Sequence, residues 1–240
     1  PLAVLEGHQN WVTSVAVAHV GGKDAVVSGG ADNTIRVFDL GSGKPLAVLE
    51  GHQSWVRSVA VAHVGGKDVV VSGGDDKTIR VFDLGSGKPL AVLEGHQSRV
   101  MSVAVAHVGG KDAVVSGGAD NTIRVFDLGS GKPLAVLEGH QGPVTSVAVA
   151  HVGGKDVIVS GGADGTIRVV TLAPKLFNAS SKLCIVHSTG SVVALKPDGA
   201  RGDLLVSASS DAWRDWSAEY RVGDLLHMTD IDDIPRAAAP

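Results

Sequence analysis

The hydrophobic and polar positions of this chain repeat with a period of 44 residues. Each period opens with a run of small and apolar residues, of which 14–18 is the first, and a Gly pair follows it. Two runs rich in β-branched residues come next, at 25–28 and 34–38, and a stretch of Gly, Asp and Asn separates them. A fourth run, 45–49, begins with Pro. Short apolar runs between turn signals predict four strands in each period.

The pattern also predicts how these strands lie. The run 14–18 is apolar on both alternating faces, which is typical of a strand covered on both sides, and its Ala residues suit a narrow central position. Pro45 can begin the outermost strand because no ladder donor is required there. A sheet with two apolar faces is not stable alone, so we expect the sheets to pack face to face. Helices are not expected, since no 3.6-residue apolar stripe is sustained.

Each period carries the same markers at fixed positions. Gly-His occurs at Gly7-His8, Gly51-His52, Gly95-His96 and Gly139-His140. Ser-Gly-Gly-x-Asp occurs at 28–32, 72–76, 116–120 and 160–164, and Phe-Asp at 38–39, 82–83 and 126–127. On these markers the chain resembles the WD40 repeat family, closely over residues 1 to about 172 and weakly over about 183 to 230. The resemblance implies an all-β fold, a β-propeller of four-stranded antiparallel blades, with about five blades in this chain.

In that family a His, a strand Ser or Thr, a turn Asp and a Trp form a hydrogen-bonded structural relay within each blade. The resemblance assigns the relay to His8, Ser28, Asp32, His52, Ser72, Asp76, His96, Ser116, Asp120, His140, Ser160 and Asp164. Phe stands where the family has Trp and has no N–H to donate, so we expect a weakened relay that ends at Ser. The fourth copy departs further, with Val170-Thr171 in place of Phe-Asp.

We expect one propeller domain over residues 1–230 and a tail at 231–240. Blades are expected at approximately 8–51, 52–95, 96–139, 140–189 and 190–230. The fifth is degenerate, with strands expected at 191–195 and 203–207 and an outer strand at 223–227. Residues 1–7 contain an outer strand without the three strands before it, which would close the ring by completing the last blade. A closed ring is the preferred arrangement, and an open arc completed by missing sequence or a second chain is the alternative.

The copies differ mainly on one side. One group of changes follows Gly-His-Gln, at 10–13, 54–57, 98–101 and 142–145, and the other lies in hairpin turns, at 31–33, 75–77, 119–121 and 163–165. These loops carry the relay's His and Asp, so we expect them on one rim of the disc, the variable rim. The opposite loops, 19–24 and 41–44 with their equivalents, hardly change and form the constant rim. Drift after duplication is an alternative explanation, but packing alone would allow it on both rims.

We interpret the variable rim as a binding surface because it carries residue types that are enriched at interface hot spots. The candidate partner-binding residues are Trp11, Trp55, Arg57, Arg99, Met101, Asp75 and Lys77.

Charge and cysteine content limit the classes of partner and of cellular location that we expect for the chain. The 21 basic and 25 acidic residues are interspersed and give a net charge of −4, so no nucleic acid partner is expected. The single cysteine, Cys184, excludes an internal disulfide and fits a cytoplasmic location. No apolar run long enough for a membrane span and no signal peptide are evident. The chain begins at Pro within a repeat, which suggests a longer parent chain.

The search for chemistry finds only repeated residues. The relay His and Ser recur in every copy, whereas an active site is singular, so we expect no enzyme, no cofactor and no metal. His19, His63, His107 and His151 are expected one to a blade and too far apart to form a metal ring. The resemblance therefore implies a non-catalytic scaffold or sensor module of the signalling type that binds a protein or peptide. One alternative is a self-assembly module that completes a propeller ring by oligomerisation. A hydrolase that uses the central channel is another.

Overall fold

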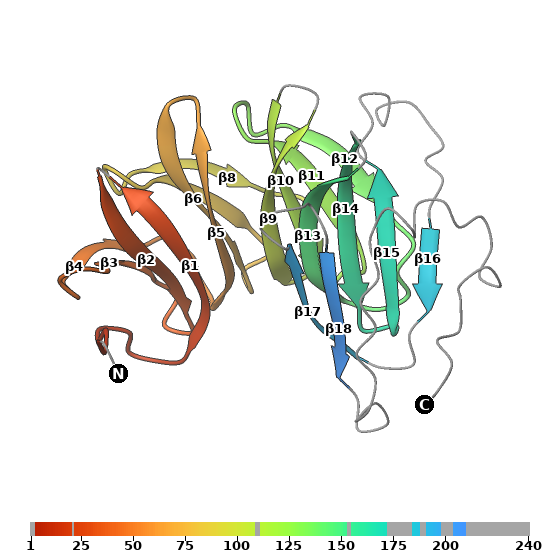
Figure 1. Ribbon diagram of the computed structural model, residues 1–240, viewed down its shortest axis with the longest axis horizontal. Helices are drawn as coiled ribbons and strands as arrows, with labels where there is room; N and C mark the ends of the chain where they lie inside the picture. The colour runs from red at the N-terminus through yellow and green to blue at the C-terminus, as the bar shows by residue number, and fades with distance from the viewer. Residues whose placement is uncertain are drawn as a thin grey trace.

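The computed structural model describes residues 3–20, 22–108, 111–152, 155–171, 184–187, 191–197 and 204–209. These residues form four four-stranded antiparallel sheets and one two-stranded sheet (Figure 1). The first sheet has the order β1 (Val12–Val20), β2 (Lys23–Gly30), β3 (Ile35–Asp39) and β4 (Pro45–Leu49). The four strands predicted for each period are therefore present, and β1 is longer at both ends than the predicted run 14–18.

The next three sheets repeat this plan, and we number the four sheets as blades 1 to 4. Their strands are β5 (Val56–Val64), β6 (Lys67–Gly74), β7 (Ile79–Asp83), β8 (Pro89–Leu93), β9 (Val100–Val108), β10 (Lys111–Gly118), β11 (Ile123–Asp127), β12 (Pro133–Leu137), β13 (Val144–Val152), β14 (Lys155–Gly162), β15 (Thr166–Thr171) and β16 (Cys184–His187). The register also repeats, since Val15 pairs with Ser28 as Val59 pairs with Ser72. These are the antiparallel blades of a β-propeller.

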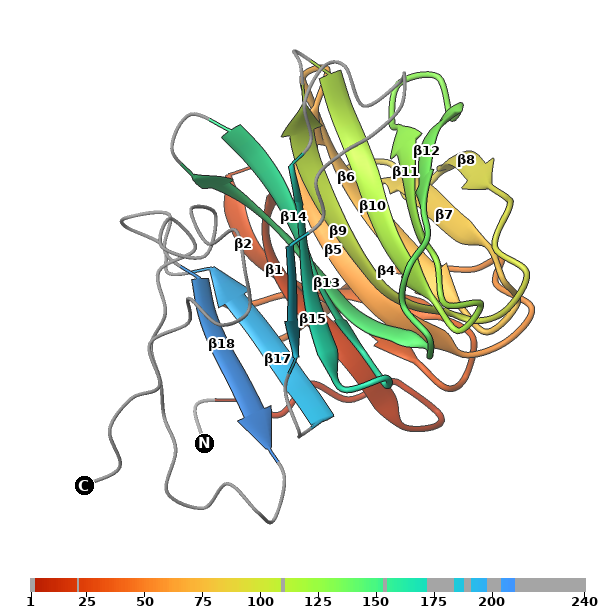
Figure 2. The same ribbon diagram turned by 90° about the vertical axis from the view of Figure 1, so that its right-hand side faces the viewer.

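The first strands of the blades are the innermost strands of the array. Strand β5 packs between β1 and β9, and β13 packs between β9 and the fifth sheet's β17 (Ser191–Pro197), which pairs with β18 (Leu204–Ser209). The blades fan outward from these strands, with blade 1 at one end of the array (Figure 1). A view turned by 90° shows the sheets stacked face to face (Figure 2). The array is an arc of stacked sheets.

Apolar residues from two neighbouring blades make each layer of the core. Each blade has a trailing face, turned to the following blade, and a leading face, turned to the preceding one. Val27 and Ile35 of blade 1's trailing face pack with Val59 and Phe82 of blade 2's leading face. The same positions meet between blades 2 and 3 and between blades 3 and 4. The blades therefore obtain their cores by stacking, as the two-sided apolar pattern predicts.

A repeated hydrogen bond accompanies this packing. In each of three blades, a backbone N–H of the innermost strand donates to a Ser hydroxyl of the preceding innermost strand. The pairs are Val59 N to Ser14 Oγ at 3.0 Å, Val103 N to Ser58 Oγ at 3.1 Å and Val147 N to Ser102 Oγ at 3.1 Å. The Ser of the apolar run thus fixes the position of one blade on the next.

No blade among the described residues lies against the leading face of blade 1. Val15 is 66% exposed, whereas its counterpart Val59 is 6% exposed. Leu40 is 45% exposed, whereas its counterpart Leu84 is 5% exposed. Val12 and Val17 are also exposed. The described residues therefore form an open arc, and the closed ring expected for the whole chain stays a prediction.

The two ends of the array are less regular than its centre. Residues 3–8 form no strand, although 1–5 repeat the sequence of β4 and were expected to close the ring. At the other end, β17 and β18 cover the positions predicted for the first two strands of a fifth blade, and β17 packs against β13 and β14. The strand predicted at 223–227 and the tail at 231–240 lie outside the described residues, so a complete fifth blade stays a prediction.

Candidate functional site

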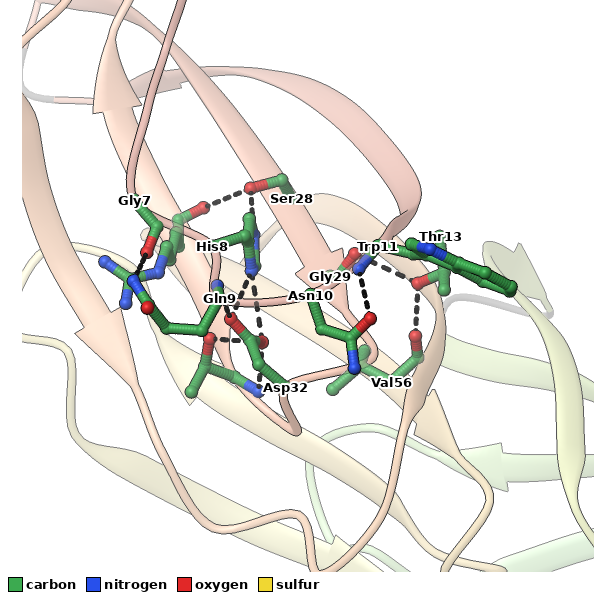
Figure 3. Close-up of polar contacts among 12 residues, drawn as sticks. Gly7, His8, Gln9, Asn10, Trp11, Thr13, Ser28, Gly29, Asp32 and Val56 are labelled. Carbon is green, nitrogen blue, oxygen red and sulfur yellow. Dashed lines mark hydrogen bonds and ion pairs between the residues drawn. The ribbon is translucent and has the colours of Figure 1, made fainter.

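The relay residues lie within hydrogen-bond distance in all four blades. In blade 1, His8 Nδ1 lies 3.0 Å from Asp32 Oδ2, and His8 Nε2 lies 2.8 Å from Ser28 Oγ (Figure 3). The corresponding His–Asp distance is 2.9 Å in blades 2, 3 and 4. The His–Ser distance is 2.8 Å in blades 2 and 3 and 2.9 Å in blade 4. The relay is thus a repeated structural device.

Steric constraints explain why Gly occupies the positions around the relay. A Cβ on Gly30 would lie 2.4 Å from His8 Nδ1, so the His ring can only lie against a bare backbone at this point. Gly7, before His8, has a φ of +153°, and its Cβ would lie 2.9 Å from Arg36 Nη1. The Gly-His and Ser-Gly-Gly markers are therefore parts of one packing arrangement.

The proton positions in the relay follow from burial. Burial lowers the pKa of His96 and His140 and outweighs their contacts with Asp120 and Asp164, which raise it. A neutral ring with its proton on Nδ1 donates to the Asp and accepts the Ser hydroxyl proton at Nε2. Since the Ser116 hydroxyl donates its single proton to the His96 ring, its 3.4 Å approach to the backbone carbonyl of Arg124 adds little to the stability of the relay. The relay ends at Ser, and the Phe that replaces Trp packs in the core between blades.

The relay Asp holds two loops of the variable rim together. Asp32 Oδ2 accepts the backbone N–H of Gln9 at 2.8 Å, and its Oδ1 accepts the N–H and the hydroxyl of Thr34. Burial raises the pKa of Asp32, but the hydrogen bonds from Gln9, Thr34 and His8 outweigh this and hold it at about 2. The N–H of Ala31 also donates to the carbonyl of Trp11 at 2.8 Å. The variable loop before each innermost strand is therefore fixed at its backbone.

This fixed backbone presents two Trp side chains in contact. Trp11 and Trp55 directly precede β1 and β5, and their rings meet edge to face with centroids 5.9 Å apart. Trp11 is 72% exposed. The guanidinium of Arg57 lies 4.7 Å from the centroid of the Trp55 ring. Trp55 is half-buried. Aromatic side chains held rigidly at a surface can bury a large area in a partner at little entropic cost.

Arg57 is itself held by Asp75 of the same blade. Its Nε and Nη2 donate to the two carboxylate oxygens, both at 2.7 Å. Blade 2 alone has this pair; blade 1 has Thr13 and Ala31 at these positions. The positive charge of Arg57 and the negative charge of Asp75, both of which blade 1 lacks, neutralise each other. Arg57 therefore orients Trp55 and is not a free cation. Sequence comparison missed this pairing, although the appearance of both charges in one repeat was a usable signal.

The other candidate residues are separate from this cluster. Arg99 is exposed at the position of the two Trp residues in blade 3, and Met101 is half-buried at the start of β9. Lys77 is exposed in the blade 2 turn, where its φ is +68°. The structure thus brings four candidates together on the variable rim: Trp11, Trp55, Arg57 and Asp75.

The constant rim has a different character. At the other end of each innermost strand an exposed His contacts an exposed or half-exposed Asp, as in His19 with Asp24 at 2.9 Å and His63 with Asp68 at 2.8 Å. Among the described residues, no three His, Cys, Asp or Glu side chains form a group that could hold a metal. In the same part of the chain we find no helix of the length and apolar character needed to cross a membrane.

Comparison with known proteins agrees with this geometry. The model of the family described as WD domain, G-beta repeat matches residues 1–39, 43–83, 87–127 and 131–170. Among solved structures, the chain is similar to the crystal structure of the computationally designed Ika4 protein, with 39% sequence identity over 72% of this chain and 98% of that chain, and a TM-score of 0.60. A search of curated proteins gave no match. Each matched repeat ends in the third strand of a blade, and the second to fourth repeats also contain the outer strand of the preceding blade, so the repeats are offset from the blades by one strand. The four repeats cover more than half of the sequence, and the chain belongs to the WD40 repeat family.

Proposed function

We propose that this chain is a non-catalytic interaction module that binds a protein or peptide partner on its variable rim. WD40 repeats generally mediate protein–protein interactions. The observation that carries the proposal for this chain is the Trp11–Trp55 pair, since two large aromatic side chains project from backbone that the relay holds in place. The relay is architecture in every blade, whereas the Trp pair occurs at one boundary only.

The chemistry of the rim indicates what the partner offers. Trp11 is open to solvent beside Trp55, whose ring is flanked by Arg57, and Arg57 is neutralised by Asp75. The pair therefore presents apolar and aromatic area, and the charge of Arg57 beside it is paired with Asp75. An apolar side chain of a partner could pack against the Trp rings, and Arg99 of the next blade would contact a polar or acidic group at the edge of the interface.

A cytoplasmic location and attachment to a longer signalling protein form part of the proposal. The single cysteine of the chain is consistent with a reducing compartment.

The test is a comparison of partner binding between matched variants. Proteins captured by the wild-type chain are identified, and the affinity of the captured partner is measured for the wild type, for Trp11→Ala and for His63→Ala on the constant rim. Loss of a hot-spot Trp costs about 2 kcal/mol, so Trp11→Ala should weaken binding by roughly 30-fold. His63→Ala should bind as the wild type does. Equal affinities of wild type and Trp11→Ala, with the fold intact by circular dichroism, would exclude the rim site.

A further inference from the structure

The leading face of blade 1, which no other described blade covers, breaks the regularity of the array. Of its exposed residues, Val12, Val15 and Val17 lie on β1, and Leu40 lies in the turn after β3. Their counterparts in blade 2 are Val56, Val59, Val61 and Leu84, which pack against the trailing face of blade 1. Blade 1 therefore presents an apolar face that three other blades of the same molecule bury. Contiguous exposed apolar area of this kind marks an interaction surface.

The interfaces between neighbouring blades of the chain indicate which kind of surface fits this face. In all three of them, the layer that covers a leading face is the trailing face of a WD40 blade, and a Ser hydroxyl from that blade accepts the N–H at the position of Val15. Among the described residues no hydroxyl accepts the N–H of Val15 itself. The occupant should thus bring a trailing blade face together with a hydrogen-bond acceptor for this amide.

The N-terminal segment carries a second, independent sign of a missing neighbour. Residues 1–5 have the same sequence as β4, which pairs with β3. The described part of this segment forms no strand, and Val4 is 74% exposed. An outer strand that precedes blade 1 would add to the third strand of a blade lying before blade 1. Both observations therefore point to a blade at the same place.

The chain's own trailing end does not fill that place. The β17–β18 sheet packs against blade 4, at the opposite end of the array, and leaves Val15 and Val17 exposed. A second copy of the chain has the same trailing end. Two copies joined head to tail would cover both leading faces with trailing ends, so that such a pair leaves neither face free.

We propose that the leading face of blade 1, with residues 3–5 beside it, is a docking surface for the trailing end of a second copy of this chain. This interaction uses a different surface from the variable rim and does not depend on the proposed partner binding.

The mass of the purified chain in solution, measured by light scattering across a dilution series, tests the proposal. The wild type should show at least twice the 24.4 kDa mass of one chain at high concentration. The variant Val17→Lys/Leu40→Lys should show the mass of one chain throughout. The control Leu90→Lys/Val92→Lys places the same two substitutions on β8, where both residues are similarly exposed, and should behave as the wild type.

A second measurement covers the case in which the charged variant folds poorly. If two copies stabilise each other, the urea midpoint of the wild type should rise with protein concentration, as it does for any folded state that binds its own copy. A wild-type mass of one chain at all concentrations would overturn the proposal. An unchanged assembly in Val17→Lys/Leu40→Lys would also overturn it, as would a urea midpoint independent of concentration.

Discussion

The near-identity of the blades allows one substitution to be compared at covered and uncovered sites. Val15 and Val59 occupy the same position in blades 1 and 2, with exposed fractions of 66% and 6%. Replacing Val by Ala removes the equivalent of two methylene groups, worth roughly 1.6 kcal/mol when fully buried, and a cavity term brings the cost to about 2–3 kcal/mol. At Val15 only about a third of that transfer term is available, or roughly 0.5 kcal/mol.

The comparison is made in the Val17→Lys/Leu40→Lys background, so that assembly of copies does not cover Val15. The free energies of unfolding of this background and of its Val15→Ala and Val59→Ala derivatives are measured by urea denaturation. Val59→Ala should lower the value by about 2–3 kcal/mol and Val15→Ala by about 0.5 kcal/mol. Equal losses at the two sites would show that the leading face of blade 1 is covered and would refute the open arc.

Three further predictions concern the variable rim and the relay. Lys77→Gly should raise the free energy of unfolding by about 1 kcal/mol, because Lys77 has a φ of +68° that Gly adopts without a Cβ clash; a lower thermal midpoint would contradict this. A double-mutant cycle with Arg57→Thr and Asp75→Ala should give a coupling energy of about 1 kcal/mol in urea denaturation, and a value near zero would deny the pairing of these side chains. The free energy of unfolding should fall in two steps on acidification. In the first step, the contribution of His96, which is buried and neutral and has a lowered pKa, is lost as the pH falls below 6.5. Asp32, whose pKa is held at about 2 against its ordinary 3.8, stabilises the fold above pH 3.8, and this contribution is lost as the pH falls from 3.8 to 2. Urea midpoints measured from pH 8 to pH 2 that stay constant would contradict both assignments.

Much of the fold could be predicted from the sequence because its determinants are local and repeated. The short apolar runs, such as 14–18, and the turn residues between them, such as 28–32, predicted four strands in each period. The His8 relay could be assigned only through the family resemblance, since nothing in the spacing of His, Ser and Asp alone requires them to meet. The steric reason for Gly30 became visible only when the His8 ring was seen against it.

The ends of the array and the details of the rim could not be predicted in the same way. Residues 2–5 read as an outer strand by composition, but a strand forms only when a neighbouring edge is present, and pattern carries no information on that edge. The contact of Trp11 with Trp55 and the pairing of Arg57 with Asp75 join loops and turns across long sequence separations. Their geometry depends on the rotation between blades, which the repeat length does not give.

Each blade gains its stability by stacking on its neighbours, so that β1 of blade 1 is less protected than the innermost strands of blades 2 to 4. Strands β1 and β13 have the same sequence, and the amide of Val147 in β13 donates to Ser102, whereas no blade in the described part of the chain precedes β1. Hydrogen exchange of these two strands in the Val17→Lys/Leu40→Lys variant measures the difference directly. We expect β1 to exchange substantially faster than β13. Equal protection of the two strands would contradict this expectation.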